Sequence, residues 1–243
     1  MRLLASATLV LLLANYVSAA ESQPVPEEGF ISLFDGRSLD GWKVGENADT
    51  FSVGDGMIRM NYNATNHHPA HLFYVGDVKH HDFKNFDLRV DVMTFPHANS
   101  GIYFHTKYQE VNWPKFGIEC QVNNSHGDWR RTGSLWGIKN ISWGPATPPK
   151  HNTEEVTLFE QPPVTDNVWY TQEVVYVNGQ VTVKLNGKTV VEYTVPDADV
   201  VHKLPTPMTW LPRGTFALQG HPPEKGYSSK TNFKNIRVKP LPD

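Results

Sequence analysis

Short segments in which apolar and polar residues alternate follow one another from residue 30 onward, and turn residues separate them. A period of two predicts antiparallel strands. The clearest strand covers residues 86–93, where apolar residues alternate with charged or polar ones, so one face is expected against a core. Residues 51–60 predict a hairpin that turns at Asp55-Gly56. Residues 173–193 predict a three-stranded meander with Asn-Gly turns at 178–179 and 186–187.

Beyond the N-terminus, no long stretch repeats apolar residues at helical spacing, which predicts little helix. The proline-rich passages 145–149 and 204–212 are expected to be loops, because proline lacks the donor that a central strand needs. Residues 123–165 are rich in Trp, Asn, His and Gly, and we expect a long functional loop there. No repeat or linker divides the chain, which predicts one domain over residues 28–241.

The N-terminus has the pattern of a secretory signal peptide. Arg2 precedes an apolar run that ends at Ala14, and small residues follow up to Ala20, which predicts a signal peptide over residues 1–19. The run is shorter than the roughly 20 residues that span a bilayer. We therefore expect an exported protein, periplasmic or secreted, with no membrane span.

Composition narrows the classes of partner. The 22 Lys and Arg against 25 Asp and Glu give a net charge of −3, and no basic stripe occurs, so nucleic acid is not an expected partner. Cys120 is the single cysteine, which excludes an intrachain disulfide. Because it stands between Glu119 and Gln121 rather than among cations, we expect a buried thiol and not a nucleophile.

The segment 116–123 carries the most chemical information. If it is a strand, Glu119, Gln121 and Asn123 share one face, opposite Ile118 and the other apolar residues. That row could present a carboxylate and two amides to a sugar, or it could be an ordinary solvated face. The stretch from Asn99 to His105 leaves a similar choice between ligand contacts and simple turn chemistry.

Other enzyme classes lack their signatures. His67 and His71 have the spacing of a helical zinc pair, but Pro69 argues against a helix, so no metal site is predicted. The motifs of serine esterases, nucleotide-binding loops, dinucleotide folds and zinc proteases do not occur. A single acidic residue, Glu119, on the informative strand disfavours a two-carboxylate glycosidase.

Several segments, in order, resemble the 3-keto-disaccharide hydrolase family over roughly residues 30–241. They are Leu33–Trp42, Phe83–Val92, Asn99–Ile102, Gly117–Gln121, Thr132–Gly137, Trp169, Leu185–Gly187, Gly214–His221 and Phe233–Val238. The resemblance implies an all-β concanavalin A-like jelly-roll sandwich of two antiparallel sheets. Long loops are expected over its concave face, with little helix.

The resemblance also implies an activity. Family members act on glycosides that carry a ketone at carbon 3, by proton removal from carbon 2, elimination and water addition. Glu119 and His221 are then the expected catalytic residues. The expected substrate contacts are Asn99, Ser100, His105, Gln121, Asn123, His126, Trp136 and Gln219. The expected partner is a small carbohydrate, and no cofactor is predicted, although calcium or another divalent ion in the cleft and the oligomeric state are left open.

Two positions depart from the family pattern. Asn124 stands where an aspartate is usual, and His105 stands where an arginine is common. We expect both in the cleft, where they would change the substrate or the activity. Two alternatives therefore stay open: a cell-surface interaction protein, and a non-catalytic carbohydrate-binding module in which Trp113, Trp129, Trp136 and Trp143 stack on sugars.

Overall fold

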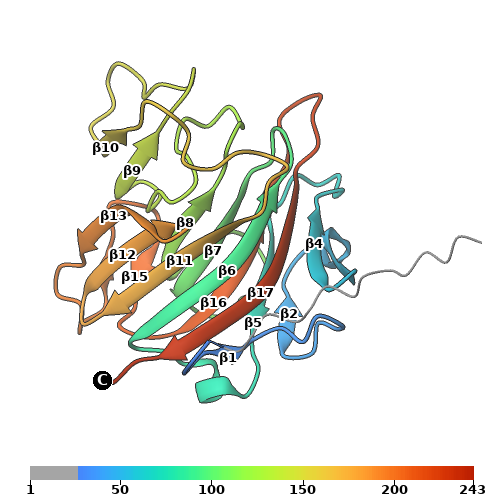
Figure 1. Cartoon of the computed structure of the whole chain (residues 1–243), viewed down its shortest axis with the longest axis vertical. Coiled ribbons are helices and arrows are strands. Elements are labelled where there is room, and N and C mark those ends of the chain that lie inside the picture. The colour runs from blue at the N-terminus through green and yellow to red at the C-terminus, as the bar shows by residue number, and fades with distance from the viewer. Residues whose placement is uncertain (1–26) are drawn as a thin grey trace, which may run out of the picture.

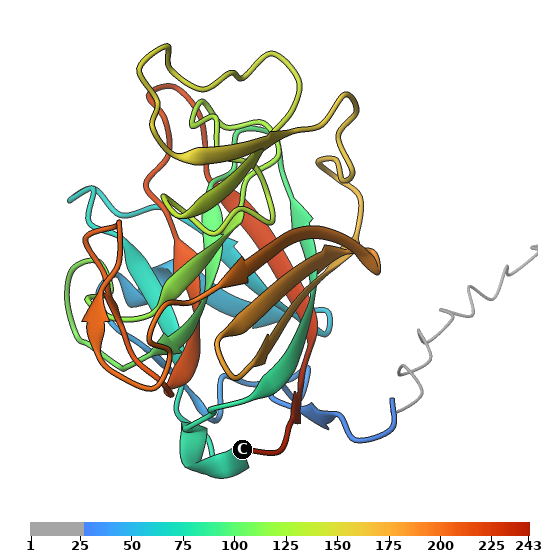
Figure 2. The ribbon, with the colours of Figure 1, turned by 90° about the vertical axis from the view of Figure 1, so that its left-hand side faces the viewer.

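The computed structural model describes residues 27–243, and the predicted signal peptide lies outside this range. Two antiparallel sheets pack face to face (Figures 1 and 2). One has the order β13-β12-β11-β6-β17-β4-β3, with β1 paired to β17, and the other has the order β2-β5-β16-β7-β8. This arrangement confirms the predicted all-β sandwich.

The eight-stranded sheet consists of β1 (Ile31–Ser32), β3 (Phe51–Gly54), β4 (Met57–Asn61), β6 (Phe86–Thr94), β11 (Tyr170–Val177), β12 (Gln180–Leu185), β13 (Lys188–Thr194) and β17 (Lys230–Pro240). The five-stranded sheet consists of β2 (Trp42–Val44), β5 (Ala70–Tyr74), β7 (Ser100–Thr106), β8 (Ile118–Val122) and β16 (Thr215–Gly220). Two small pairs are β9 (Lys139–Ser142) with β10 (Glu155–Leu158), and β14 (His202–Lys203) with β15 (Thr209–Trp210). The helices of the described chain are two 3-10 turns, η1 (Ala48–Thr50) and η2 (Val78–His81).

The strands follow the alternation in the sequence. The predicted strand 86–93 is β6, and its inward apolar residues Phe86, Leu88, Val90 and Val92 are all buried. The predicted hairpin is β3 and β4, and the predicted meander is β11, β12 and β13. Asn178 and Asn186 have φ of 47° and 49°, the left-handed conformation that these two-residue turns require.

Aromatic side chains from both sheets form the core. Phe86 of β6 lies 5.9 Å from Phe104 of β7 and 4.9 Å from Phe216 of β16, measured between ring centroids. Burial of one such side chain stabilises the fold by roughly 1.5–3 kcal/mol. Cys120 is one of the inward residues of β8, and its sulfur accepts a hydrogen bond of 3.0 Å from Gln172 of the opposite sheet. Burial raises the pKa of the Cys120 thiol to about 12, which confirms the predicted buried thiol.

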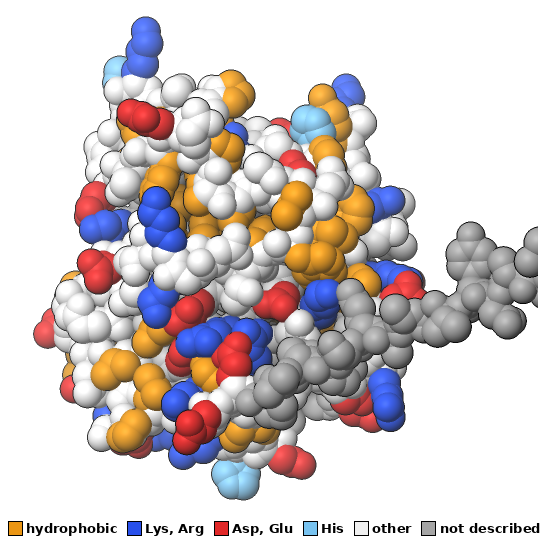
Figure 3. Space-filling model, in the orientation of Figure 1, with side chains coloured by type: hydrophobic (Ala, Val, Ile, Leu, Met, Phe, Trp, Pro, Cys, Tyr) orange, Lys and Arg blue, Asp and Glu red, His pale blue; other side chains and the backbone are white. Residues whose placement is uncertain are grey.

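Charged side chains of both signs lie on the outer face of the eight-stranded sheet. Lys184 pairs with Glu173 at 2.7 Å, and Arg89 pairs with Asp87 at 2.9 Å. Figure 3 shows acidic and basic side chains together on this side of the molecule. Opposite charges in register neutralise one another, so this face presents no field of a single sign.

His105 does not follow the alternation of β7. Its backbone has φ of 52°, and the pairing with β16 shifts register between Thr215 and Ala217. This bulge turns the ring into the core, 4.5 Å from Tyr176 and 4.7 Å from Trp210 between centroids. Both ring nitrogens face backbone carbonyls, of Leu211 and Lys84. The expectation that His105 lies in the cleft is therefore wrong.

The long segment 123–165 is not a loop throughout. Leu135 bridges Cys120 of β8 and Lys139 of β9, and β9 then pairs in parallel with β10. These pairings place β9 and β10 beyond β8, at the edge of the five-stranded sheet, as Figure 1 shows. Residues 145–149 form a loop, as the prolines predict. Within residues 27–243, no helix has the length and apolar character needed to cross a membrane.

Candidate functional site

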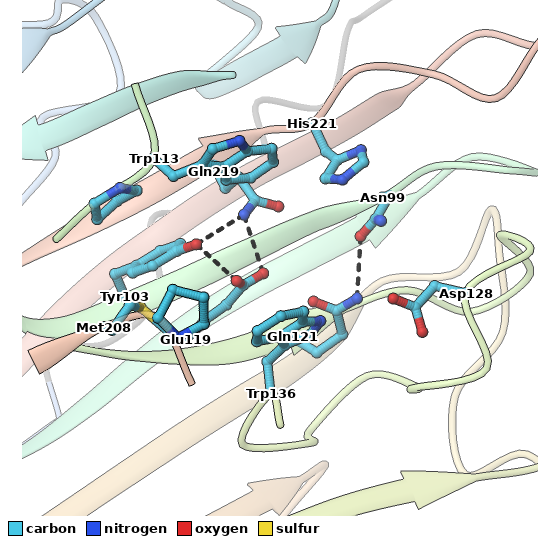
Figure 4. A pocket seen from close by; sticks show the side chains of 12 residues that line it. Asn99, Tyr103, Trp113, Glu119, Gln121, Asp128, Trp136, Met208, Gln219 and His221 are labelled. Carbon is cyan, nitrogen blue, oxygen red and sulfur yellow. Dashed lines mark hydrogen bonds between the residues drawn. The ribbon is translucent and has the colours of Figure 1, made fainter. Parts of the chain in front are cut away.

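A cavity of about 300 Å³ opens on the outer face of the five-stranded sheet (Figure 4). Alternation explains its position: Cys120 faces the opposite sheet, so its neighbours Glu119 and Gln121 on β8 face the cavity. The residues that line it are Asn99, Tyr103, Trp113, Pro114, Glu119, Gln121, Asp128, Trp136, Pro207, Met208, Gln219 and His221.

Three side chains on three neighbouring strands form a closed ring of hydrogen bonds on the cavity floor. The hydroxyl of Tyr103 on β7 donates to Oε2 of Glu119 at 2.6 Å. The amide of Gln219 on β16 donates to Oε1 of Glu119 and to the oxygen of Tyr103, both at 3.0 Å. Both carboxylate oxygens are therefore held in a fixed orientation.

Burial dominates the electrostatics of Glu119. The side chain is 6% exposed, and its desolvation raises the pKa from the ordinary 4.5 to about 7, although the bonds from Tyr103 and Gln219 oppose the rise. A carboxyl group with this pKa exchanges its proton near neutral pH. That is the property expected of a general base or acid.

Gly101 makes room for this carboxylate. Tyr103 lies opposite Glu119 in the pairing of β7 with β8, and Gly101 lies opposite Gln121. A Cβ placed on Gly101 would approach Oε1 of Glu119 to 2.6 Å. Gly101, the second residue of β7, thus sets the position of the Glu119 side chain.

Two amides continue the floor beyond Glu119. Gln121 donates through Nε2 to Oδ1 of Asn99 at 3.1 Å, which leaves the Nδ2 group of Asn99 to donate to a ligand. The Oε1 atoms of Gln121 and Gln219 are buried and accept no hydrogen bond from the described residues. A ligand with hydroxyl groups would satisfy these acceptors.

His221 lies at the end of β16 and has a defined tautomer. Its Nδ1 faces the carbonyl oxygen of Pro222 at 2.6 Å, so Nδ1 carries the proton and Nε2 holds a lone pair in the neutral ring. Burial lowers the pKa of His221, and the nearby His126 lowers it further. The ring is therefore neutral near pH 7 and can accept a proton at Nε2.

Two tryptophans lie on opposite sides of the cavity (Figure 4). Trp113 belongs to the loop 107–117, where the Gln109 amide donates to the carbonyl oxygens of residues 111, 112 and 113. Trp136 lies 4.9 Å from the guanidinium of Arg130, which Glu154 holds through two hydrogen bonds of 2.9 and 2.6 Å. The ring of Trp136 is therefore held in place before any ligand binds, and the bonds from Gln109 fix the backbone that carries Trp113.

Six of the ten predicted site residues line the cavity: Asn99, Glu119, Gln121, Trp136, Gln219 and His221. The other four lie elsewhere. His105 is in the core, and Ser100 donates to the carbonyl oxygen of Gln219, which joins two strands. Asn123 donates to the carbonyls of Asp128 and Arg130 and so shapes the following loop. His126 lies behind His221, with 5.7 Å between ring centroids.

The second departure from the family pattern, Asn124, is also outside the cavity. It accepts a hydrogen bond from Thr132 at 2.6 Å and donates to Thr94 at 2.8 Å, and it is buried under the long segment. The expectation that Asn124 and His105 change the cleft is therefore wrong for both. Asn124 fastens the segment 123–165 to β6, and His105 packs the core.

The sequence interpretation missed several lining residues. Tyr103 follows Asn99 and Gly101 at the period of two, so the alternation of β7 could have identified it. The sequence indicates Trp113 only as a stacking residue of a binding module. Asp128, Met208 and the two prolines, Pro114 and Pro207, come from loops, where no periodicity indicates which side chains converge.

The charge of the lining favours a neutral ligand. Its charged residues among those that the structure describes are Glu119 and Asp128, and it contains no Lys or Arg. A phosphate or carboxylate ligand would find no cation there. Over residues 27–243, no group of three or more His, Cys, Asp or Glu is arranged to hold a metal ion.

Comparisons with known proteins agree with this geometry. The family model of the 3-keto-alpha-glucoside-1,2-lyase-like domain matches residues 29–239. A proposed glycosyl hydrolase from Parabacteroides distasonis ATCC 8503 is similar in structure, with a TM-score of 0.60 and 20% identity over 88% of this chain and 95% of that chain. A second such protein from that organism has a TM-score of 0.57 and 20% identity over 87% of this chain and 99% of that chain.

A domain whose structure contains a bound oligosaccharide shares the fold more distantly. The exoplasmic or lumenal domain of VIP36, in a form that holds Ca²⁺ and Man3GlcNAc, has a TM-score of 0.50 and 11% identity over 90% of each chain. Together with the two packed antiparallel sheets, this similarity confirms the predicted concanavalin A-like sandwich. A search of curated proteins finds no match.

Proposed function

The chain belongs to the family of 3-keto-alpha-glucoside-1,2-lyase-like domains, and from this premise we propose that it cleaves 3-keto-glycosides at carbon 1 of the oxidised sugar. The family membership confirms the resemblance seen in the sequence. The specific reaction rests on the cavity described above and on the chemistry of a sugar with a ketone at carbon 3.

Proton removal from carbon 2 is the first step of the proposed reaction. The ketone acidifies this proton, so one carboxylate can take it without a paired acid. Glu119 is the proposed base, because it is the one buried carboxylate on the floor and its pKa of about 7 leaves a large ionised fraction at neutral pH. Hydrogen bonds from Tyr103 and Gln219 fix the orientation of the two carboxylate oxygens of Glu119.

The charge released by this step moves onto the oxygen at carbon 3. A donor aimed at that oxygen lowers the barrier, and removal of one such donor typically costs about 10²–10³ in kcat. Asn99 is the proposed donor, because Gln121 fixes its Oδ1 and leaves its Nδ2 group free for the ligand.

Departure of the aglycone completes the elimination. The charged oxygen at carbon 3 re-forms the ketone, the electron pair between carbons 2 and 3 becomes the second bond between carbons 1 and 2, and the bond from carbon 1 to the aglycone oxygen breaks. That oxygen takes the broken bond's electron pair and receives the proton that Glu119 removed. Water then adds to carbon 1, with its proton accepted at Nε2 of His221, and a proton returns to carbon 2, which gives the free 3-keto-sugar. The net reaction is hydrolysis.

One observation carries this proposal: a buried carboxylate with a pKa of about 7 on the floor of a cavity that could hold a sugar. The test is NMR in deuterated water with a 3-keto-glucoside and its unoxidised parent. We expect cleavage of the keto compound alone, with deuterium at carbon 2 of the product.

The matched variants are Glu119→Gln and Glu173→Gln. Both glutamates are 6% exposed, but Glu173 lies on β11 and pairs with Lys184 away from the cavity. We expect Glu119→Gln to lose more than about 10³ of the rate and Glu173→Gln to retain it. Equal losses in both variants would mean that Glu119→Gln lowers the rate by disturbing the fold and not by removing the base.

A non-catalytic carbohydrate-binding module is the second candidate, and one observation favours it. Trp113 is 44% exposed although it lines the cavity, as a sugar-stacking platform would be. In that case the parent glycoside would bind with equal affinity to the wild type and to Glu119→Gln, and neither glycoside would be cleaved.

Export through the signal peptide remains part of the proposal, and N-terminal sequencing of the mature protein tests it.

A further inference from the structure

The two ends of the cavity differ in chemistry. Polar side chains lie at one end: Asn99, Gln121, Asp128 and His221. Apolar surface lies at the other: Pro114, Pro207, Met208 and the ring of Tyr103. Figure 4 shows Asn99, Asp128 and His221 on one side of Glu119, and Tyr103 and Met208 on the other.

The sheet register explains this separation. β7 and β8 are antiparallel, so Asn99 before β7 lies near the end of β8, and Gln121 lies between it and Glu119. The start of β8 lies at the opposite end. There, Thr209 pairs with Phe116, and the backbone amide of Thr209 donates to the carbonyl oxygen of Lys115 at 2.8 Å. These contacts bring Met208 beside Pro114.

The apolar end has no free polar side chain among the residues that line it. The one hydroxyl there, on Tyr103, already donates to Glu119 and accepts from Gln219. A second sugar placed at this end would bury hydroxyl groups without partners, and each unsatisfied group costs about 1–3 kcal/mol. A flat apolar group would instead gain contacts with the thioether of Met208 and with an aromatic ring.

We infer that the leaving group is an aromatic alcohol, which occupies the end lined by Met208, while the keto-sugar occupies the end lined by Asn99. This inference rests on the proposed function and names its substrate class as aryl 3-keto-glycosides rather than disaccharides. Glu119 lies between the two ends, where the bond from carbon 1 to oxygen would break. A phenol loses its proton with a pKa near 10, as tyrosine does. It therefore leaves more readily than a sugar alcohol, in a cavity that offers few acids to protonate it.

The test compares two 3-keto-glucosides of the same anomeric configuration, one with phenol and one with glucose as the aglycone. Phenol is the better leaving group in any enzyme, so the informative quantity is the change in preference caused by a substitution. We expect Met208→Gln to lower the ratio of kcat/KM for the phenyl compound to kcat/KM for the disaccharide roughly tenfold. Met208→Leu keeps the apolar surface and should retain the preference.

Binding of the unoxidised glycosides tests the same end of the cavity without turnover or variants. By calorimetry, phenyl glucoside should bind the wild type at least about tenfold more tightly than the glucose disaccharide. This inference is wrong if both keto-glycosides are cleaved but the two unoxidised glycosides bind with equal affinity. It is also wrong if Met208→Gln does not change the preference between the keto-glycosides. Either result would leave the proposed function intact. Turnover of neither keto-glycoside would overturn the proposed function, and the inference with it.

Discussion

At the scale of single residues, the chemistry depends on the protonation state of Glu119. Because burial raises its pKa to about 7, the ionised base is scarce in acid. We expect log kcat/KM to rise with unit slope below pH 7 and to level off above it. Burial lowers the pKa of His221, so the ring of His221 is neutral on the plateau above pH 7 and can accept a proton there. A profile that is flat from pH 5 to 8 would contradict the assignment of Glu119 as the base.

Gly101 provides a second prediction at this scale. In Gly101→Ala, the new methyl group would displace the Glu119 carboxylate, whose side chain can move while the strands stay in place. We expect kcat/KM to fall about 10²-fold, since a shift of about 1 Å has this effect in other enzymes, and the melting temperature to change little.

The control for this prediction is Gly187→Ala, in the hairpin between β12 and β13. Gly187 has φ of 79° and open space around it, so alanine there strains the turn without approaching the cavity. It should lower stability and retain activity. If Gly101→Ala retained full activity, the position of Glu119 would not depend on that glycine.

The sequence could identify residues that obey the period of two and no others. Glu119 and Gln121 follow from the alternation of β8, and Tyr103 follows from that of β7. His105 should share the face of Tyr103, but its left-handed backbone reverses the side chain. Nothing local in a histidine predicts a bulge, because the bulge depends on the pairing with β16.

At the scale of elements, the strands and their Asn-Gly turns were predictable because each depends on local residues. The parallel pair of β9 and β10 was not, since its partners are separated by a proline-rich loop and no turn motif joins them. The interpretation of residues 123–165 as a functional loop thus missed a small element that supports Trp136 through Arg130 and Glu154.

This support is testable with two adjacent glutamates. Glu154→Gln removes the carboxylate that makes the two shorter hydrogen bonds to Arg130 and leaves the longer contact with Asp128 at 3.3 Å, so the guanidinium holds the ring of Trp136 less firmly. We expect ligand affinity to fall about fivefold, in line with roughly 1 kcal/mol for an exposed or half-buried charge pair. Glu155→Gln, which removes only the ion pair with Lys139, should bind normally. Calorimetry on both variants checks this, and equal affinities would exclude the role of Glu154.

At the scale of the whole molecule, the buried carboxyl group makes stability depend on pH. The folded pKa of Glu119 lies above the ordinary 4.5, so the native state retains a proton that the unfolded chain releases. Stability therefore falls as pH rises from about 4.5 to 7, by about 3 kcal/mol in total, and then levels off. Glu119→Gln should not show this loss, so urea unfolding of the two proteins should diverge as pH rises. Parallel curves would contradict the raised pKa.

Cys120 reports on the cooperativity of the whole sandwich. It is the only thiol, it is fully buried, and burial raises its pKa to about 12. We expect a thiol reagent such as DTNB to label the native protein only when the two sheets separate, so that labelling follows global unfolding. Rapid labelling without denaturant would mean that β8 opens locally.

The two ends of the cavity also have separate origins in the chain. The groups that handle the proton stand on β7, β8 and β16, whose inward faces are fixed by the core. Apart from Tyr103, the apolar end comes from the loop 107–117 and from residues 204–208, which precede the short strand β15 and lie outside the two main sheets. Relatives could therefore diversify by exchanging these loops, acquiring new leaving groups while the reaction centre is inherited unchanged. Grafting such loops is accordingly the natural route to redesign selectivity in this scaffold.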